Sequence, residues 1–237
     1  FRSLRELDLS GNPNLGDVRA ALNAYTNIVV GRGTGPRIWH WCTRDNPQLT
    51  QQFADIMTNF HSLRELYIWN DNQSGPLVVG STNLTDVWAS RNRFTSADFT
   101  GQSNLWRVIL SDNELTNLVL TGCTGLRQLQ AQRNQLPTAV LDHVLATLDT
   151  SGPALESADL TSNAQFPSAI GYTHYSNLVD RGVTVKLDFP ANNDGRYNVP
   201  GGTNAITFVT SSQYPNLEIR IDLIVATNIF WHWGDGT

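Results

Sequence analysis

The residues best placed for chemistry are two acids, Glu65 and Asp86, which lie 21 positions apart, and Arg107, which follows Asp86 by the same interval. If strands repeat with that period, the three side chains fall in one column of a parallel sheet. Two neighbouring carboxylates can divide acid and base roles between them. An arginine next in the column instead favours a ladder of ion pairs, and this simpler interpretation is the one that we adopt.

Motifs for metal binding and covalent catalysis are weak in this chain. Asn70-x-Asn72-x-Ser74-Gly75 resembles the start of a calcium loop, but Ser81 stands where such a loop needs its acid. The sequence contains no Gly-Xaa-Ser-Xaa-Gly, His-Glu-Xaa-Xaa-His or phosphate-loop motif. We therefore predict that the chain is not an enzyme and uses no metal or other cofactor. An enzyme with its catalytic domain elsewhere is a third hypothesis that no residue here supports.

The two cysteines, Cys42 and Cys123, form neither a close-spaced metal pair nor a disulfide framework. In the repeat frame described below, Cys42 projects from the sheet, whereas Cys123 lies on the return side of a distant coil. A disulfide needs Cα atoms within about 7 Å of each other. We therefore predict that these cysteines are not bonded to each other.

Composition and charge limit the class of partner. The chain has 237 residues, 16 Lys and Arg against 21 Asp and Glu, a net charge of −5 and no basic run, which argues against nucleic acid. No apolar stretch is long enough to cross a bilayer. The sequence starts at Phe1 inside a repeat, so we expect that its amino end has been cut away. Abundant Asn and Thr, with Lys186 as the single lysine, suit a secreted microbial surface protein.

The strongest pattern in the sequence is a repeat of 21 residues. Leu63, Leu84, Leu105 and Leu126 follow one another at this interval. Each begins the same frame: apolar, two free positions, apolar, one free, apolar, two free and then usually Asn. Apolar residues two positions apart face one side of a strand, so each frame predicts a strand with one buried face. The seven frames are Leu4/Leu7/Leu9/Asn12, Ile38/Trp41/Thr43/Asn46, Leu63/Leu66/Ile68/Asp71, Leu84/Val87/Ala89/Asn92, Leu105/Val108/Leu110/Asn113, Leu126/Leu129/Ala131/Asn134 and Leu155/Ala158/Leu160/Asn163.

This spacing resembles the leucine-rich-repeat family, and the resemblance covers residues 1–189. It implies an α/β solenoid, a horseshoe with a parallel sheet on its concave face and mixed helical and extended returns on its convex face. The Asn of each frame lies where the chain leaves the strand. There its amide can bond backbone groups of neighbouring coils, which predicts an Asn ladder along the solenoid.

The return segments differ along the chain. Apolar spacing predicts helices over Gln48–His61, from Pro137 onward, and over Pro167–Gly182, the last ending on a glycine cap. Phe94 and Phe99 are matched by Leu115 and Leu120, and these central returns are predicted to be extended. Val183, Val185 and Leu187 predict a closing strand. Since helical returns force curvature, we expect the middle of the sheet to be its flattest part.

A second domain is predicted for residues 190–237. Its turn-rich start precedes two strand-like runs, Ala205–Thr210 and Leu217–Val225, and the ending Trp231-His-Trp233-Gly-Asp-Gly-Thr237. That ending resembles the signature of PKD-type domains, which are immunoglobulin-like β sandwiches. The resemblance implies an incomplete all-β sandwich, because about three strands cannot bury both faces of two sheets. We expect Ile219, Ile221, Phe230, Trp231 and Trp233 to be covered by chain beyond this sequence or by another subunit.

Aromatic residues are concentrated at the outward positions of the central repeats. Trp39, Tyr67, Trp69, Trp88 and Trp106 occupy such positions, whereas those of the frames at Leu4, Leu126 and Leu155 contain no aromatic residue. Aromatics are also good strand formers, but that property would not confine all five to the centre. Exposed apolar patches rimmed by polar residues mark interaction sites. The predicted site is therefore Trp39, His40, Arg64, Tyr67, Trp69, Trp88, Trp106 and Arg107.

Two functions agree with these patterns. The first is a non-catalytic extracellular or cell-surface recognition or adhesion module, which binds protein or glycan through the aromatic patch. Aromatic faces can stack on sugars and can also anchor protein contacts, so the sequence leaves both ligands open. The second is a structural subunit of a surface fibre or extracellular filament. In that case the patch or the incomplete sandwich is a contact for self-assembly.

Overall fold

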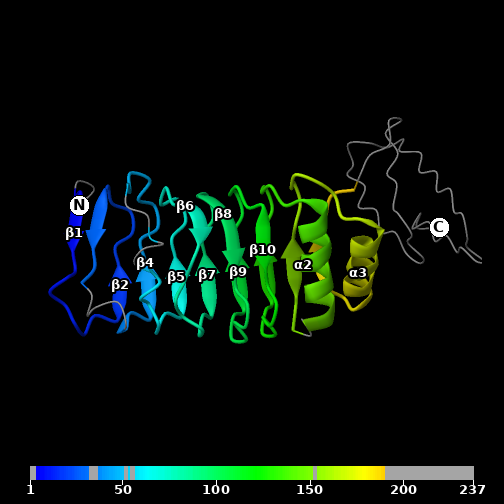
Figure 1. Cartoon of the computed structure of the whole chain (residues 1–237), viewed down its shortest axis with the longest axis horizontal. Coiled ribbons are helices and arrows are strands. Elements are labelled where there is room, and N and C mark those ends of the chain that lie inside the picture. The colour runs from blue at the N-terminus through cyan, green and yellow to red at the C-terminus, as the bar shows by residue number, and fades with distance from the viewer. Residues whose placement is uncertain (1–3, 32–36, 51–52, 54–56, 152–153, 190–237) are drawn as a thin grey trace, which may run out of the picture.

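The computed structural model describes residues 4–31, 37–50, 53, 57–151 and 154–189, and these form a stack of coils (Figure 1). Most coils contribute one strand to an eight-stranded sheet in which every pairing is parallel. Its strands follow chain order along the stack. They are β2 (Asp17–Arg19), β4 (His40–Cys42), β5 (Glu65–Tyr67), β7 (Asp86–Trp88), β9 (Arg107–Ile109), β11 (Gln128–Gln130), β12 (Ser157–Asp159) and β13 (Thr184–Lys186).

Among the described residues, the return side of the stack consists of short strands and of helices α2 (Thr138–Ser151) and α3 (Ala169–Asp180). The strands β6 (Ser74–Leu77), β8 (Arg93–Asp98) and β10 (Asn117–Val119) form a parallel three-stranded sheet, in the central region whose pattern predicts extended returns. Helices α2 and α3 pack against each other at the carboxyl-terminal end (Figure 1). No helix among the described residues is long and apolar enough to span a bilayer.

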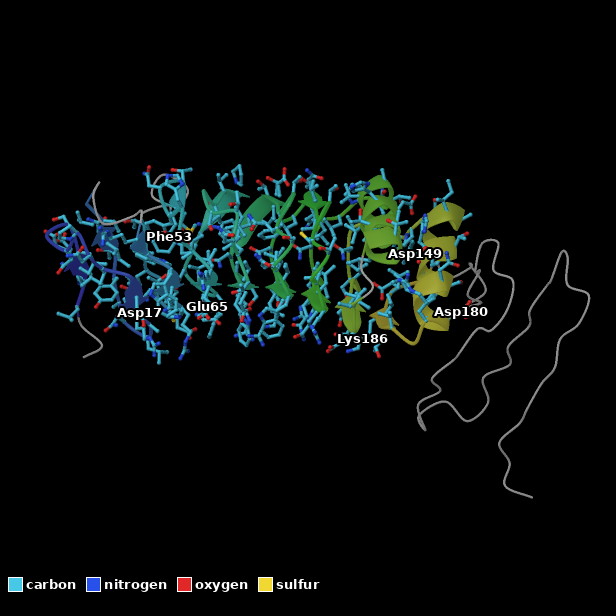
Figure 2. All side chains as sticks on the ribbon, turned by 90° about the horizontal axis from the view of Figure 1, so that it is seen from below. Asp17, Phe53, Glu65, Asp149, Asp180 and Lys186 are labelled. Atoms are coloured by element: carbon cyan, nitrogen blue, oxygen red, sulfur yellow. The ribbon has the colours of Figure 1, made fainter. Side chains whose placement is uncertain are left out.

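The stack is almost straight in both views, not curved like the predicted horseshoe (Figures 1 and 2). Strands in a sheet are spaced by about 4.8 Å, and this spacing applies to both sides of the coils wherever the returns are strands. Packed helices need about 8–10 Å, but the described helices occupy only one end. Because the coils are spaced about equally on the sheet side and the return side, the stack does not curve. We call the outward side of the eight-stranded sheet the sheet face.

The prediction for the first frame is wrong. The strand in that frame, β1 (Glu6–Asp8), pairs with β3 (Asn27–Val29) on the return side and not with the eight-stranded sheet. The sheet instead starts at β2, within a frame that the sequence analysis missed: Leu15, Val18, Ala20 and Asn23. Val18 and Ala20 are buried, whereas Leu4 is half exposed at 50%. Burial of Val18 and Ala20 against the next coil therefore decides which frame joins the sheet.

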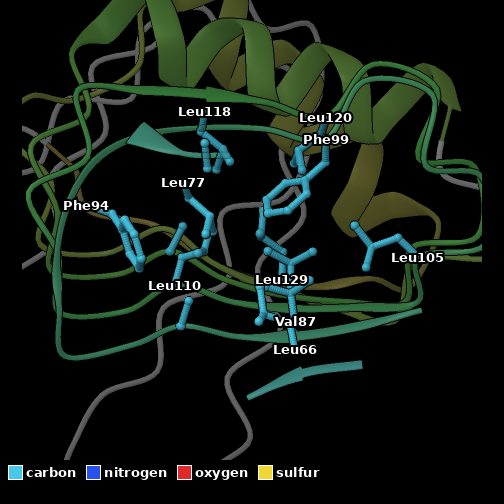
Figure 3. Close-up of a cluster of buried hydrophobic side chains, with 14 of the residues drawn as sticks. Leu66, Leu77, Val87, Phe94, Phe99, Leu105, Leu110, Leu118, Leu120 and Leu129 are labelled. Atoms are coloured by element: carbon cyan, nitrogen blue, oxygen red, sulfur yellow. The ribbon is translucent and has the colours of Figure 1, made fainter. Parts of the chain in front are cut away.

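The core lies inside the coils, between the sheet and the returns. Leu66, Val87 and Leu129 of the sheet strands point toward Leu77 and Leu118 of the return strands (Figure 3). All five of these side chains are at most 3% exposed. The inward positions of the frame thus fill the solenoid, as the alternation predicts.

Ladder asparagines connect successive coils, which confirms the predicted role of this residue. The Asn113 side chain donates from Nδ2 to the carbonyls of Ala89 and Leu110, each at 3.0 Å, and accepts the Phe94 N–H at 3.0 Å. Asn46, Asn92, Asn134 and Asn163 make equivalent bonds. The residue before each of these asparagines has positive φ although none is glycine, as at Arg91 and Asp112. Positive φ is uncommon for residues other than glycine, so the hydrogen bonds of the ladder help to hold the chain in this turn.

Asp71 replaces the ladder asparagine in one coil. It is fully buried, and it accepts hydrogen bonds from the Thr43 hydroxyl at 2.6 Å and the Asn46 N–H at 3.0 Å. Burial raises the pKa of the Asp71 carboxyl to about 8, against the lowering effect of those two bonds. Thr43 stands at an inward position that is apolar in the other predicted frames, so the two polar residues form a pair within the core.

Two helices and the closing strand lie where apolar spacing predicts them. α2 begins directly after Pro137, and α3 starts from Ser168, whose hydroxyl accepts the Ile170 N–H at 3.2 Å. Gly182, with φ of 85°, follows the end of α3. β13 pairs with β12. The predicted helix over Gln48–His61 includes residues 51–52 and 54–56, which lie outside the described residues. The whole predicted second domain, residues 190–237, also lies outside them.

Both cysteines are free and buried, which confirms that they are not bonded to each other. Burial raises the pKa of the Cys123 thiol from 9.0 to about 11 and also raises that of Cys42. Since the thiolate is the reactive form, native Cys123 should alkylate at pH 8 roughly 100-fold more slowly than a free thiol. Mass spectrometry after iodoacetamide pulses measures this rate. Denatured protein should react at both positions, and fast native labelling of Cys123 would contradict the buried position.

Candidate binding surface on the sheet face

The predicted aromatic residues meet on the sheet face around a groove of about 560 Å³. Strands β4, β5 and β7 place His40, Tyr67 and Trp88 there, while Trp69 follows β5. Successive strands keep the 21-residue register, so Tyr67 lies opposite Trp88 and Asp86 opposite Arg107. The residues that line the groove are Arg19, Ala21, His40, Cys42, Arg44, Glu65, Tyr67, Trp69, Trp88 and Arg107.

Tyr67, Trp69 and Trp88 form one aromatic cluster. The ring centroids are 5.3 Å apart for Trp69 and Trp88, 5.9 Å for Tyr67 and Trp88, and 6.4 Å for Tyr67 and Trp69. These distances and the tilted geometries are those of favourable aromatic pairs. All three residues are partly buried, because each ring covers its neighbours. The cluster thus has a fixed shape.

Two arginines stack on the cluster. The Arg44 guanidinium lies 4.8 Å from the Trp69 ring, and that of Arg107 lies 4.6 Å from Trp88 and 4.3 Å from Trp106. Cations over indole faces are attracted by the negative charge density of the ring. The indole faces in the groove are therefore already occupied in part by the chain's own arginines.

Asp86 connects the aromatic cluster to Arg107, as the ion-pair interpretation predicts. It accepts a hydrogen bond from Nε of Arg107 at 3.0 Å, a second from Nη2 of Arg107, and one from the Tyr67 hydroxyl at 3.0 Å. The pKa of Tyr67 is raised well above its ordinary value, first by burial and then by the Asp86 charge. Hydrogen bonding to Asp86 also raises the pKa of Arg107. Glu65, in the preceding coil, shares no hydrogen bond with Asp86 among the described residues, as a catalytic dyad would; its carboxylate lies 3.8 Å from Nε2 of His40.

His40 lies on the floor of the groove and is 5% exposed. Its Nδ1 is 2.7 Å from Asp17 Oδ1, and its ring contacts Tyr67 edge-on at a centroid distance of 5.4 Å. Burial alone would raise the pKa of Asp17, but hydrogen bonds from Arg19 and His40 lower it below its ordinary value. Asp17 and Tyr67 therefore hold the His40 ring in place in the groove.

The remaining predicted site residues lie around the groove. Trp39 and Trp106 are 41% and 39% exposed, and Arg64 between their coils is exposed but does not line the groove. Sequence reasoning missed Arg19 and Ala21, because they belong to the overlooked frame at Leu15. The predicted assembly residues Ile219, Ile221, Phe230, Trp231 and Trp233 lie outside the described residues.

Metal binding has little support in the part of the chain that the structure describes. No three His, Cys, Asp or Glu side chains are grouped there to hold an ion. In the segment that resembles a calcium loop, the Asn70 amide donates to Asp45 at 3.1 Å and that of Asn72 to the Leu49 carbonyl at 2.7 Å. These amides thus connect adjacent coils.

Stacked parallel coils with one sheet strand each define a solenoid, a class of protein that typically serves as a non-catalytic binding scaffold. A family model described as Leucine Rich Repeat matches residues 3–23, which supports a leucine-rich-repeat family for this chain. Such repeats commonly mediate protein binding. A search of the curated proteins found no match.

Proposed function

We propose that this chain is a recognition module that binds a protein partner through the groove on the sheet face. The observation that carries the proposal is the cluster of Tyr67, Trp69 and Trp88 with Arg44 and Arg107 stacked on it. Trp, Tyr and Arg dominate the binding energy of protein interfaces, and rigid aromatics lose little entropy when they bind. The groove spans strands β2 to β9, so an extended segment of a partner can contact several coils at once.

The groove geometry favours a protein over a glycan. A sugar binds an aromatic side chain by stacking on an open ring face, but Arg44 and Arg107 lie over Trp69 and Trp88, and the rings also face one another. The lining instead combines ring edges, guanidinium groups and the Glu65 carboxylate. Such a mixture fits the alternating apolar and polar groups of a polypeptide.

We further propose that the module acts at the cell surface or outside the cell. Support comes from the composition, with many Asn and Thr residues and one lysine, and from the resemblance of the carboxyl-terminal residues to PKD-type domains. Under the alternative of a surface fibre or extracellular filament, the same groove would contact another subunit.

Truncation of the cluster tests the proposed function. Trp69→Ala and Trp88→Ala should each weaken partner binding by about 2–4 kcal/mol, because buried aromatic anchors dominate interfaces. Both rings are partly buried, so a stability loss of about 1 kcal/mol should accompany the change. Ile170→Ala serves as the control, since Ile170 is 68% exposed on α3, away from the groove.

The measurement is binding of the labelled chain to parallel arrays of extracellular proteins and glycans, followed by titration of each hit. Protein hits that disappear in both tryptophan variants and persist in Ile170→Ala would support the proposal. Hits confined to glycans would contradict the choice of partner. Normal binding by variants that melt many degrees lower would show that the cluster is structural.

A further inference from the structure

We infer that Asp86 is the positioning residue of the sheet-face groove, because it fixes the Arg107 guanidinium between two indoles. This inference rests on the proposed binding role of the groove, but its test requires no partner. Asp86 is 3% exposed, and it is a charged residue at an outward position of the sheet. Arg107 contacts Trp88 and Trp106, which come from different strand repeats.

The geometry explains why an acid is needed at this position. A guanidinium that stacks on two rings must be held in a defined plane, and an aspartate that receives bonds from both Nε and Nη2 fixes that plane. The Tyr67 hydroxyl donates to the same carboxylate, so the third ring of the cluster is tied to this contact. One buried carboxylate thereby holds the tyrosine, the arginine and, through the arginine, two tryptophans.

Stability alone gives a weaker account of the pair. Removing two charges from water costs about as much as their attraction returns, so buried ion pairs often add little net stability. Their better attested role is to select one geometry among several. A comparable pair elsewhere shows the contrast: Arg133 also donates to Asp112 across one coil, but the side chains are 58% and 32% exposed, and no aromatic ring of the described residues stacks on Arg133. Asp112–Arg133 thus provides a matched control.

The test is nuclear magnetic resonance of the full chain labelled with nitrogen-15. Indole cross-peaks are assigned by Trp→Phe variants, and the Arg107 Nε–H cross-peak by Arg107→Lys. In Asp86→Asn, the Arg107 Nε–H peak should be lost to solvent exchange and the Trp88 and Trp106 indole peaks should shift. The indole peak of the core residue Trp41, which is fully buried, should stay in place. Asp112→Asn should move none of these four peaks.

Two outcomes would overturn the inference. In the first, all four peaks remain unchanged in Asp86→Asn, which means that Asp86 does not hold Arg107. In the second, the Trp41 peak moves with the others and the melting temperature falls, which means that the ion pair supports the fold in general. If Asp86→Asn does not fold, Asp86→Glu tests the same contact, because glutamate keeps the charge and Arg107 but moves the carboxylate by one methylene group. Shifts of the Trp88 and Trp106 peaks alone would then support the inference, and unchanged peaks would refute it.

Discussion

Replacement of Asn113 by alanine should lower the free energy of unfolding by about 3 kcal/mol, because it removes three buried hydrogen bonds of 3.0 Å, worth about 1 kcal/mol each, and a longer one of 3.4 Å to the Ser111 carbonyl. Asn113 is 7% exposed, and its side chain is the acceptor for the Phe94 N–H. Alanine would leave that N–H without this acceptor, inside a coil that water does not reach. The Ala89 and Leu110 carbonyls would each lose one donor.

Asn12 provides a matched control for this prediction. It occupies the same frame position, but it is exposed, and among the described residues its amide donates within its own turn, to the Leu9 carbonyl at 3.3 Å. Asn12→Ala should therefore cost no more than about 0.5 kcal/mol. Urea unfolding followed by circular dichroism measures both changes. Equal losses in the two variants would contradict the placement of the first frame outside the sheet.

Asp71→Asn should remove a pH dependence of stability that the wild-type chain shows between about pH 4 and pH 8. The folded pKa of Asp71 is about 8, against an ordinary value of 3.8 when the chain is unfolded. The folded state therefore keeps a proton that the unfolded state releases, so stability is fully present below the unfolded pKa and is lost as the pH rises toward the folded pKa. The loss approaches about 1.4 kcal/mol per pH unit. Between pH 5 and pH 7.5 the wild-type chain should lose about 3 kcal/mol relative to the variant.

An asparagine can replace Asp71 without leaving its neighbours unpaired. Its amide oxygen accepts the Asn46 N–H, and the Thr43 hydroxyl accepts from the amide nitrogen, since a hydroxyl can donate or accept. Asp112→Asn is the control: the hydrogen bond from Arg133 lowers the pKa of Asp112, so its contribution is constant over this range. Urea titrations at several pH values give the comparison. Parallel curves for the wild-type chain and Asp71→Asn would show that the buried carboxyl is not the cause.

The repeat frame predicted the local structure of most coils because strand alternation and coil length are properties of the sequence itself. The period of 21 residues sets which side chains share a column. The strand register that places Glu65 opposite Asp86, and Asp86 opposite Arg107, therefore follows from spacing alone. The Asn ladder follows for the same reason, since a polar amide at a fixed turn position has backbone groups of the adjacent coil within reach.

The first coil shows where this reasoning fails. Leu4 and Leu15 each begin an acceptable frame, and one coil cannot place both frames in the same sheet. Alternation is a local property and is satisfied by either frame. Which frame joins the eight-stranded sheet depends on the packing of Val18 and Ala20 against the next coil. The sequence of the segment itself does not indicate this packing.

For the candidate binding surface, the repeat frames from Ile38 onward predicted which residues project from the sheet, but not how their side chains meet. Only the tertiary structure shows that His40 and Asp86 are buried, that Arg44 and Arg107 cover indole faces, and that the stack is nearly straight. The physical reason is that column membership is fixed by backbone register, whereas long side chains reach across several strands. Their final positions depend on hydrogen bonds and ring contacts between coils, and curvature depends on the width of every return segment in the stack.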